Sequence, residues 1–159
     1  MQLLKEIPGV DWRWAAVLIA ELGVDMKIFA SASQRACWAG VCPGNNESAG
    51  KRKSGRTTKG NFDLKTALVE AAHAASRAKG TYRCDKFHRL KARRGAKRAG
   101  VAVAPKILVA IYHMLSQHVY YNDLGDLYLD KRNKQHLTRN LGHRLERLGF
   151  QVTLQQLAA

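Results

Sequence analysis

The sequence predicts a mainly α-helical protein, and three observations lead to that expectation. Apolar residues recur at intervals of three and four over much of the chain, which is the spacing of one helix face. Glycines stand where these stretches end, as they do after helices. A chain of 159 residues, 46% of them hydrophobic, is also long enough to bury a sizeable core. We expect a domain that opens with a helix-hairpin-helix-like pair and continues through a long basic loop and long helices to a short C-terminal strand.

Four helices are expected in the first half of the chain, over residues 3–7, 12–22, 33–40 and from 61 or 63 to about 80. Pro8-Gly9 ends the first helix and Gly23 ends the second, because neither residue type continues a helix well. Ser33 is a candidate cap for the third. Residues 43–60, which follow it, are expected to form a flexible, glycine-rich loop.

Three further helices are expected over residues 82–94, 101–118 and 130–148, followed by a strand over residues 150–154. Pro105 would fall in the first turn of its helix, where a missing N–H is tolerated. Gly149 closes the last helix, and the alternation after it is typical of a strand. No run approaches the roughly 18 apolar residues that a membrane-spanning helix needs, so no membrane span is expected, and nucleic acid is favoured over a membrane as the partner.

The charge balance indicates a polyanionic partner. The formal net charge is +15 and the pI is ≈ 10.2, an excess that nucleic acid usually offsets. An anionic membrane surface and a merely soluble basic protein are the alternatives. Cys37, Cys42 and Cys84 lack Cys-x-x-Cys spacing, so neither a disulfide framework nor a zinc site is expected. With no signal-peptide pattern, the sequence favours a cytoplasmic, nucleoid-associated protein.

The basic loop carries the strongest functional signal. Ser48 lies in it and is followed by five cations with no intervening acid: Lys51, Arg52, Lys53, Arg56 and Lys59. A loop this basic attracts phosphate, and a hydroxyl held among phosphate-binding cations is a candidate nucleophile for a phosphodiester. A plain DNA-binding loop would have the same composition, so both interpretations stay open.

A second basic cluster spans residues 77–106 and contains a single acid, Asp85. Its cations are Arg77, Lys79, Arg83, Lys86, Arg89, Lys91, Arg93, Arg94, Lys97, Arg98 and Lys106. Spacings of three and four indicate a phosphate track on one helix face. The residues assigned to this track are Arg83, Lys86, Arg89, Arg93 and Arg94. The alternative is a solvated charged face with no binding role.

The first two expected helices meet at Gly9-Val10, the layout of a helix-hairpin-helix. In that motif, backbone N–H groups at the turn hold a DNA phosphate without reading sequence. Asp11 stands where the motif usually has a second glycine, and it could instead serve only as the N-cap of the second helix. Phosphate binding and a purely structural turn therefore both stay open.

Acidic residues are too scattered to predict a metal centre. Asp63 and Glu70 are the only pair placed to share an ion on one helix face, whereas nuclease sites bring three or four acids to Mg²⁺. No metal site is expected in this chain. Tyr120 and Tyr121 are candidate nucleophiles by residue type, but packing or a turn role is the favoured interpretation.

Short motifs, taken in order, resemble one transposase domain. They are Ile7-Pro8-Gly9-Val10, the stretch from Ala15 to Gly23, Ala39-Gly40-Val41-Cys42-Pro43, Glu47-Ser48-Ala49-Gly50, Thr58-Lys59-Gly60-Asn61 and Ala67-Leu68-Val69-Glu70-Ala71-Ala72. In order and spacing they are similar to the C-terminal domain of the insertion sequence 110 family of transposases. The resemblance covers residues 3–121, so we expect a helical domain over residues 1–121 and a helical extension over 122–159.

The resemblance implies a role in DNA transposition and recombination. Family members pair an N-terminal RuvC-like domain, which carries four metal-binding acids, with a helical domain that contributes a serine nucleophile. By position that serine is Ser48, and Ser54 is the poorer match. Some members are directed to DNA by a structured guide RNA, and members work as oligomers. DNA, a guide RNA and further copies of the chain are therefore expected partners.

The chain departs from the family because the RuvC-like domain does not precede the Ile7-Pro8-Gly9 hairpin. A serine hydroxyl is a weak nucleophile until a base or metal activates it, and neither Glu47 nor His73 is an obvious base. We therefore expect the chain alone to bind nucleic acid with little strand transfer. It is expected to hold no cofactor, Mg²⁺ belonging to the RuvC-like domain. The alternative is a non-catalytic binding module left from a decayed transposase.

Overall fold

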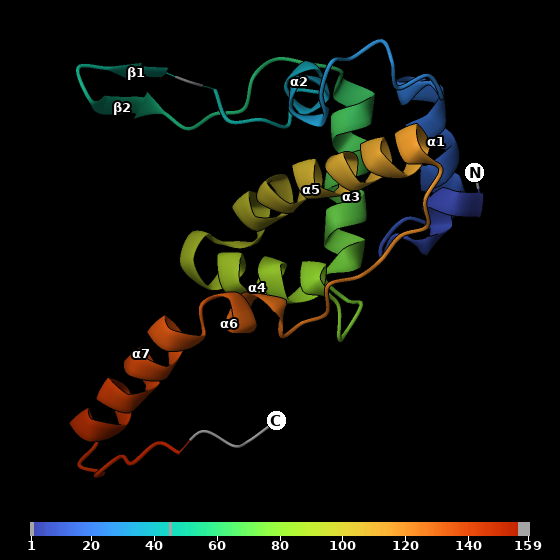
Figure 1. Ribbon diagram of the computed structural model, residues 1–159. Helices are drawn as coiled ribbons and strands as arrows, with labels where there is room; N and C mark the ends of the chain where they lie inside the picture. Colours follow the sequence, from blue (N-terminus) through green and yellow to red (C-terminus); the bar gives the residue numbers. More distant parts are fainter. Residues whose placement is uncertain (1, 45, 156–159) are drawn as a thin grey trace. The chain divides into compact units, whose positions relative to one another are not determined.

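The computed structural model describes residues 2–44 and 46–155, and within them the fold is mainly α-helical, as the sequence predicted (Figure 1). The elements, in chain order, are the 3-10 helix η1 (Gln2–Glu6), α1 (Trp12–Leu22), α2 (Ala32–Trp38), β1 (Asn46–Ser48), β2 (Lys51–Ser54), α3 (Phe62–Ala75), α4 (Tyr82–Arg94), α5 (Ala96–Gln117), α6 (Tyr128–Arg132) and α7 (Lys134–Arg147). The chain divides into two compact units, Met1–Asp126 and Leu127–Ala159. The first unit thus includes residues 122–126, which the sequence placed in the extension.

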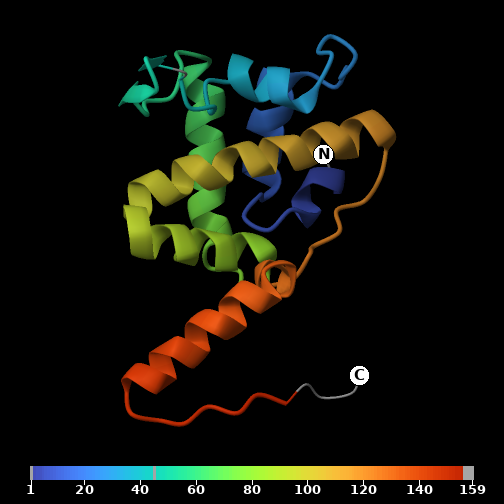
Figure 2. The same cartoon turned by 60° about the vertical axis from the view of Figure 1, so that its left-hand side comes forward.

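The first unit is built around two crossing helices. Helix α5 packs across α3 and against α4, while α1 lies against α3 (Figures 1 and 2). Leu64 and Leu68 of α3 and Ile107 and Ile111 of α5 have no exposed surface. These contacts make the hydrophobic core, which holds α4 and the segment between α2 and α3 in place.

Local capping explains why several helices begin where they do. The Asp11 carboxylate accepts a hydrogen bond from the Trp14 N–H (2.9 Å) at the start of α1. The Asn61 side chain accepts from the Leu64 N–H (3.0 Å) at the start of α3, and its amide donates to Glu21 of α1 (2.6 Å). Each cap satisfies a helix N–H that has no partner within its helix. The predicted bounds of α1 and α4 are confirmed.

Other expected helix boundaries were wrong. Helix α2 begins at Ala32 and is capped by Ser31, whose hydroxyl accepts from the Gln34 N–H (3.2 Å), rather than by Ser33. Helix α3 ends at Ala75, before the turn that leads to Gly80. The last expected helix is two helices, α6 and α7, separated at Asn133. Residues 150–154 form no strand, because an alternating pattern needs a partner strand to pair with.

Helix α5 is longer than the sequence indicated. It begins at Ala96, directly after Gly95, so Pro105 lies inside the helix instead of in its first turn. By length and composition α5 could cross a membrane, which the sequence did not predict. Its residues Val103, Ile107 and Ile111 are nonetheless fully buried against the other helices of the unit. A buried central helix has the same length and composition, so these two properties alone do not make α5 a membrane span.

Candidate nucleic-acid interface

Residues 46–54 form a two-stranded antiparallel ribbon in the segment that the sequence predicted to be a flexible loop. Ser48 pairs with Lys51 across a two-residue turn, and both turn residues have positive φ, 50° at Ala49 and 73° at Gly50. Two positive φ angles are typical of a type I′ turn, whose twist matches that of a β-hairpin. Ser48 therefore lies beside the tip of an ordered ribbon, with its side chain exposed.

The base of the ribbon is fastened by close backbone contacts. The Gly44 N–H donates to the Arg56 carbonyl (2.7 Å), which joins the two arms of the chain below the strands. Gly40 and Gly60 lie back to back, so close that a Cβ on Gly60 would collide with the Gly40 backbone. The positions of Lys53 and Arg56 are thereby tied to the helical body.

A groove opens between the base of the ribbon and the corner where α4 meets α5. Its volume is about 1060 Å³. Among the described residues, five cations and no acid line it: Lys53, Arg56, Arg94, Lys97 and Arg98. Most of the remaining lining is apolar: Val41, Pro43, Leu90, Val101, Ala102 and Pro105. The two basic clusters of the sequence thus meet at one groove.

The bulge in the ribbon explains how Lys53 reaches this groove. Glu47 pairs with Arg52 and Asn46 pairs with Ser54, so Lys53 has no residue opposite it. A bulge bends its strand and turns the extra side chain out of the regular alternation. Lys53 then lines the groove together with Ser54.

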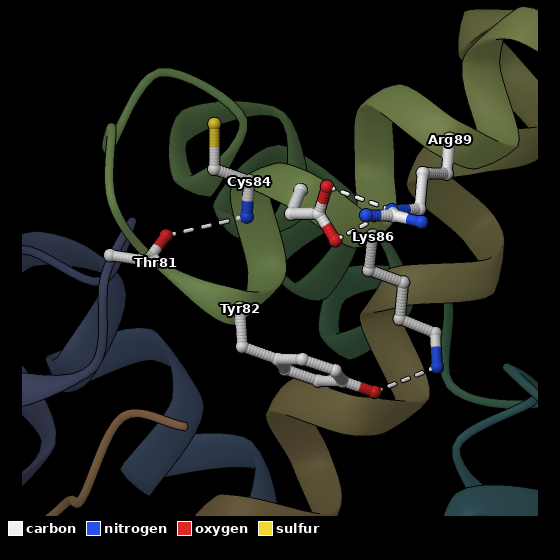
Figure 3. Close-up of polar contacts among 6 residues, drawn as sticks. Thr81, Tyr82, Cys84, Lys86 and Arg89 are labelled. Carbon is white, nitrogen blue, oxygen red and sulfur yellow. Dashed lines mark hydrogen bonds and ion pairs between the residues drawn. The ribbon is translucent and has the colours of Figure 1, made fainter. Parts of the chain in front are cut away.

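Two of the predicted phosphate-binding cations of α4 already have partners within that helix. The Lys86 ammonium donates to the Tyr82 hydroxyl (2.8 Å), and Arg89 forms an ion pair with Asp85 (2.8 Å) (Figure 3). The Asp85 carboxylate offsets the charge of Arg89 locally, but an exposed pair of this kind is weak and does not hold the arginine firmly. Asp85 therefore offsets one charge of the predicted track, whereas the Tyr82 hydroxyl orients Lys86 and leaves its charge in place.

Arg83, the first residue of that track, is buried. It is 3% exposed, and its guanidinium carbon lies 4.5 Å from the centre of the Tyr121 ring. The Tyr121 hydroxyl donates to one Asp123 oxygen (2.7 Å), and the other accepts from the N–H groups of Tyr82 (2.9 Å) and Gly125 (2.8 Å). Arg83 thus holds the segment after α5 instead of facing a ligand, and Tyr121 has the packing role that the sequence favoured.

The network around the buried Arg83 also shifts the pKa values of its members. Burial lowers the pKa of Arg83, although the neighbouring Tyr121 and Asp123 oppose that change. Burial alone would raise the pKa of Asp123, but the hydrogen bonds from Tyr121, Tyr82 and Gly125 and the charge of Arg83 outweigh it and lower the pKa. Asp123 is therefore a carboxylate at neutral pH and compensates the buried arginine.

The other predicted site residues are distributed more widely. Lys51 is exposed on β2, Lys59 is exposed close to the ribbon base, and Arg93 is exposed at the end of α4. The side chain of Arg52 lies outside the described part of the structure. Lys97 and Arg98, which the sequence placed in the second cluster but not in the track, line the groove. Gly95 separates them from α4 and forms the corner between α4 and α5, so this glycine is the sequence feature that could have identified them.

Within the described part of the chain, no side chain that could act as a general base contacts the Ser48 hydroxyl. This hydroxyl has no hydrogen-bond partner there, and Glu47, one residue away, belongs to the opposite face of the strand. His73 packs edge-on against Phe87 (5.4 Å between ring centres) and lies beside Gly100 in the helical body. Ser54 differs from Ser48, because its hydroxyl accepts from the Arg56 N–H (3.2 Å).

The contacts of the Gly9-Val10 turn favour a structural role. A Cβ on Gly9 (φ 90°) would collide with the carbonyl of Ala71 in α3. Val10 is 4% exposed, and its N–H donates to a carbonyl of the preceding turn (3.0 Å). Asp11 caps α1 through the Trp14 N–H and places negative charge where a phosphate would bind. Phosphate binding at Gly9 and Val10 stays a prediction.

The described residues contain no group of three His, Cys, Asp or Glu side chains that could hold a metal ion. Asp63 and Glu70 are both exposed on α3. Burial, with a smaller effect of the neighbouring Cys37, raises the pKa of Cys42 to about 11. Cys42 therefore stays a protonated thiol at neutral pH.

Comparison with known proteins assigns the family. The model described as the Transposase IS116/IS110/IS902 family matches residues 1–89, which run from η1 through the ribbon and most of α4. No curated protein and no solved structure shows significant similarity to the chain. The matched segment contains Ser48 and the ribbon wall of the groove, whereas the α5 wall lies beyond it. Because the match covers more than half of the sequence, the chain belongs to the IS116/IS110/IS902 family of transposases.

Proposed function

We propose that this chain is the DNA-binding, serine-bearing part of a transposase. In this proposal the ribbon and the groove hold a nucleic-acid backbone, and Ser48 is the nucleophile in DNA transposition and recombination. The observation that carries it is the convergence of five cations, with no acid among the described residues of the groove lining, next to the ribbon that bears the serine. Cations gathered in this way attract phosphates largely without regard to base sequence.

The chemistry needs a base that the described part of the chain does not supply. In the proposed step the Ser48 oxygen bonds to phosphorus and gives its proton to a base, while the bond from phosphorus to a sugar oxygen breaks and that oxygen takes up a proton. The product is a serine-linked phosphodiester with the same number of phosphate ester bonds. We propose that a RuvC-like domain, which would hold Mg²⁺, supplies the activation that the serine needs. A guide RNA and further copies of the chain complete the proposed assembly in the cytoplasm, at the nucleoid.

A second candidate is a non-catalytic nucleic-acid-binding module left from a decayed transposase. The exposed Ser48 hydroxyl, with no base on it in the described residues, supports this alternative. The two candidates share the binding surface and differ only in the use of the serine.

A covalent-adduct assay with the Ser48→Ala variant separates them. The chain is incubated with nicked, end-labelled DNA, together with a separately supplied RuvC-like domain and Mg²⁺, and the adduct is resolved on a denaturing gel. The transposase proposal expects an adduct that Ser48→Ala abolishes while DNA affinity is unchanged. Ser54→Ala is the matched control, because it removes the other ribbon hydroxyl and should leave the adduct. If no adduct forms although DNA binds, the chain is a binding module.

A further inference from the structure

The residues that line the groove bear on whether its ligand is duplex or single-stranded nucleic acid. Five cations line the groove, but most of its other described lining residues are apolar, among them Leu90, Val101 and Pro105. A duplex presents phosphates on its outside and keeps its base faces stacked within, so it would leave this apolar surface without a partner. A single strand exposes both phosphates and base faces.

We propose that the groove between the ribbon and the α4–α5 corner binds a single-stranded polynucleotide. This inference rests on the proposed function and specifies the ligand of that same surface. The phosphates lie along Lys53 and Arg56 on one wall and along Arg94, Lys97 and Arg98 on the other, and unpaired bases contact the apolar lining residues.

Three features of the groove determine how it would hold a single strand. The volume of about 1060 Å³ lies above the range of about 300–1,000 Å³ for small-molecule sites, so it leaves room for more than one nucleotide. No aromatic ring is among the described residues that line the groove, so the bases contact aliphatic side chains, proline and arginine planes without stacking on a ring, and little sequence preference follows. The cations belong to two elements, the ribbon and the α4–α5 corner, so both sides of one backbone can be neutralised.

The test measures fluorescence anisotropy of the full chain with labelled oligonucleotides of about 20 nucleotides, as single-stranded DNA, single-stranded RNA and duplex DNA of the same sequence. The groove variant is Arg94→Ala/Lys97→Ala/Arg98→Ala. The matched control is Lys5→Ala/Arg13→Ala/Lys27→Ala, which removes the same charge at exposed positions outside the groove. Circular dichroism verifies that both variants fold.

The proposal expects single strands to bind about tenfold more tightly than the duplex, with the groove variant losing about tenfold in single-strand affinity. The control variant should lose about twofold or less. The slope of log affinity against log salt should fall by about 2 in the groove variant, because each lost phosphate contact removes about 0.7 for a single strand. Tighter binding of the RNA or of the DNA oligonucleotide identifies which of the two fills the groove.

Two outcomes would overturn this inference while the proposed function stands. One is duplex DNA that binds as tightly as the single strands. The other is a groove variant that behaves like the control. Failure of every oligonucleotide to bind at low salt would instead overturn the proposed function itself, and with it the inference.

Discussion

The ribbon and helix α4 are both rich in cations, but the surroundings of these cations differ. At the base of the ribbon, Lys53 and Arg56 line a groove whose described residues include no acid. On α4, Arg83 is buried over Tyr121, and Arg89 is paired with Asp85. The difference shows that a count of cations does not locate an interface. These two arginines of α4 have partners within the fold, one distant in the sequence and one a single turn away, whereas the described lining of the groove contains cations and no acid.

The largest expected effect is on folding, from Arg83→Ala. The side chain fills space against Tyr121 and compensates Asp123, so its removal leaves a cavity and an under-compensated carboxylate. We expect the free energy of unfolding to fall by about 3 kcal/mol, while nucleic-acid affinity per folded molecule stays the same. Urea unfolding measures the first quantity and fluorescence anisotropy the second.

Arg93→Ala is the matched control, since it makes the same substitution at an exposed position of the same helix. It should change the free energy of unfolding by less than about 0.5 kcal/mol. Equal destabilisation by the two variants would show that Arg83 does not have the internal role described for it.

A smaller effect is expected from Asp123→Asn. The substitution removes the charge that faces Arg83 and weakens the hydrogen bonds of this carboxylate, which together should cost about 1–2 kcal/mol of unfolding free energy. Since folding lowers the pKa of Asp123, its stabilising contribution is present above the unfolded pKa of about 4 and is lost as pH falls through the folded pKa.

The pH dependence of unfolding by urea measures this contribution. The wild-type chain should lose more stability than Asp123→Asn on acidification from neutral pH to below about pH 3. Identical pH profiles would mean that Asp123 is no more stabilised as a carboxylate in the folded protein than in the unfolded chain.

The sequence predicted those features that depend on neighbouring residues. Asp11 and Gly23 bound α1, and Gly95 closes α4, because caps act within one or two turns. The ribbon was not predicted, because it is almost entirely polar and its Ala49-Gly50 turn lacks the usual Asn-Gly signal. Ser48 and the composition of its surroundings were evident from the sequence, but their arrangement was not.

Long-range contacts account for most of the remaining differences. The burial of Arg83 depends on Tyr121 and Asp123, which are far away in the sequence and reach it only after α5 has crossed α3. Arg35 of α2 is likewise 1% exposed and donates to the Leu22 carbonyl, which no local pattern indicated. The groove combines two basic clusters for the same reason, since only the folded chain brings them together.

The most direct test of the central claim compares two charge-matched variants, Lys53→Ala/Arg56→Ala in the groove and Lys86→Ala/Arg89→Ala on α4. Both lose two positive charges, and the measurement is the affinity for labelled single-stranded and duplex DNA over about 50 to 200 mM salt. The account predicts that the groove variant loses about tenfold in affinity and about 1.4–1.8 in salt slope for the DNA that binds, while the α4 variant changes affinity by about twofold or less. A larger loss in the α4 variant than in the groove variant would contradict the account and return the interface to the face of α4.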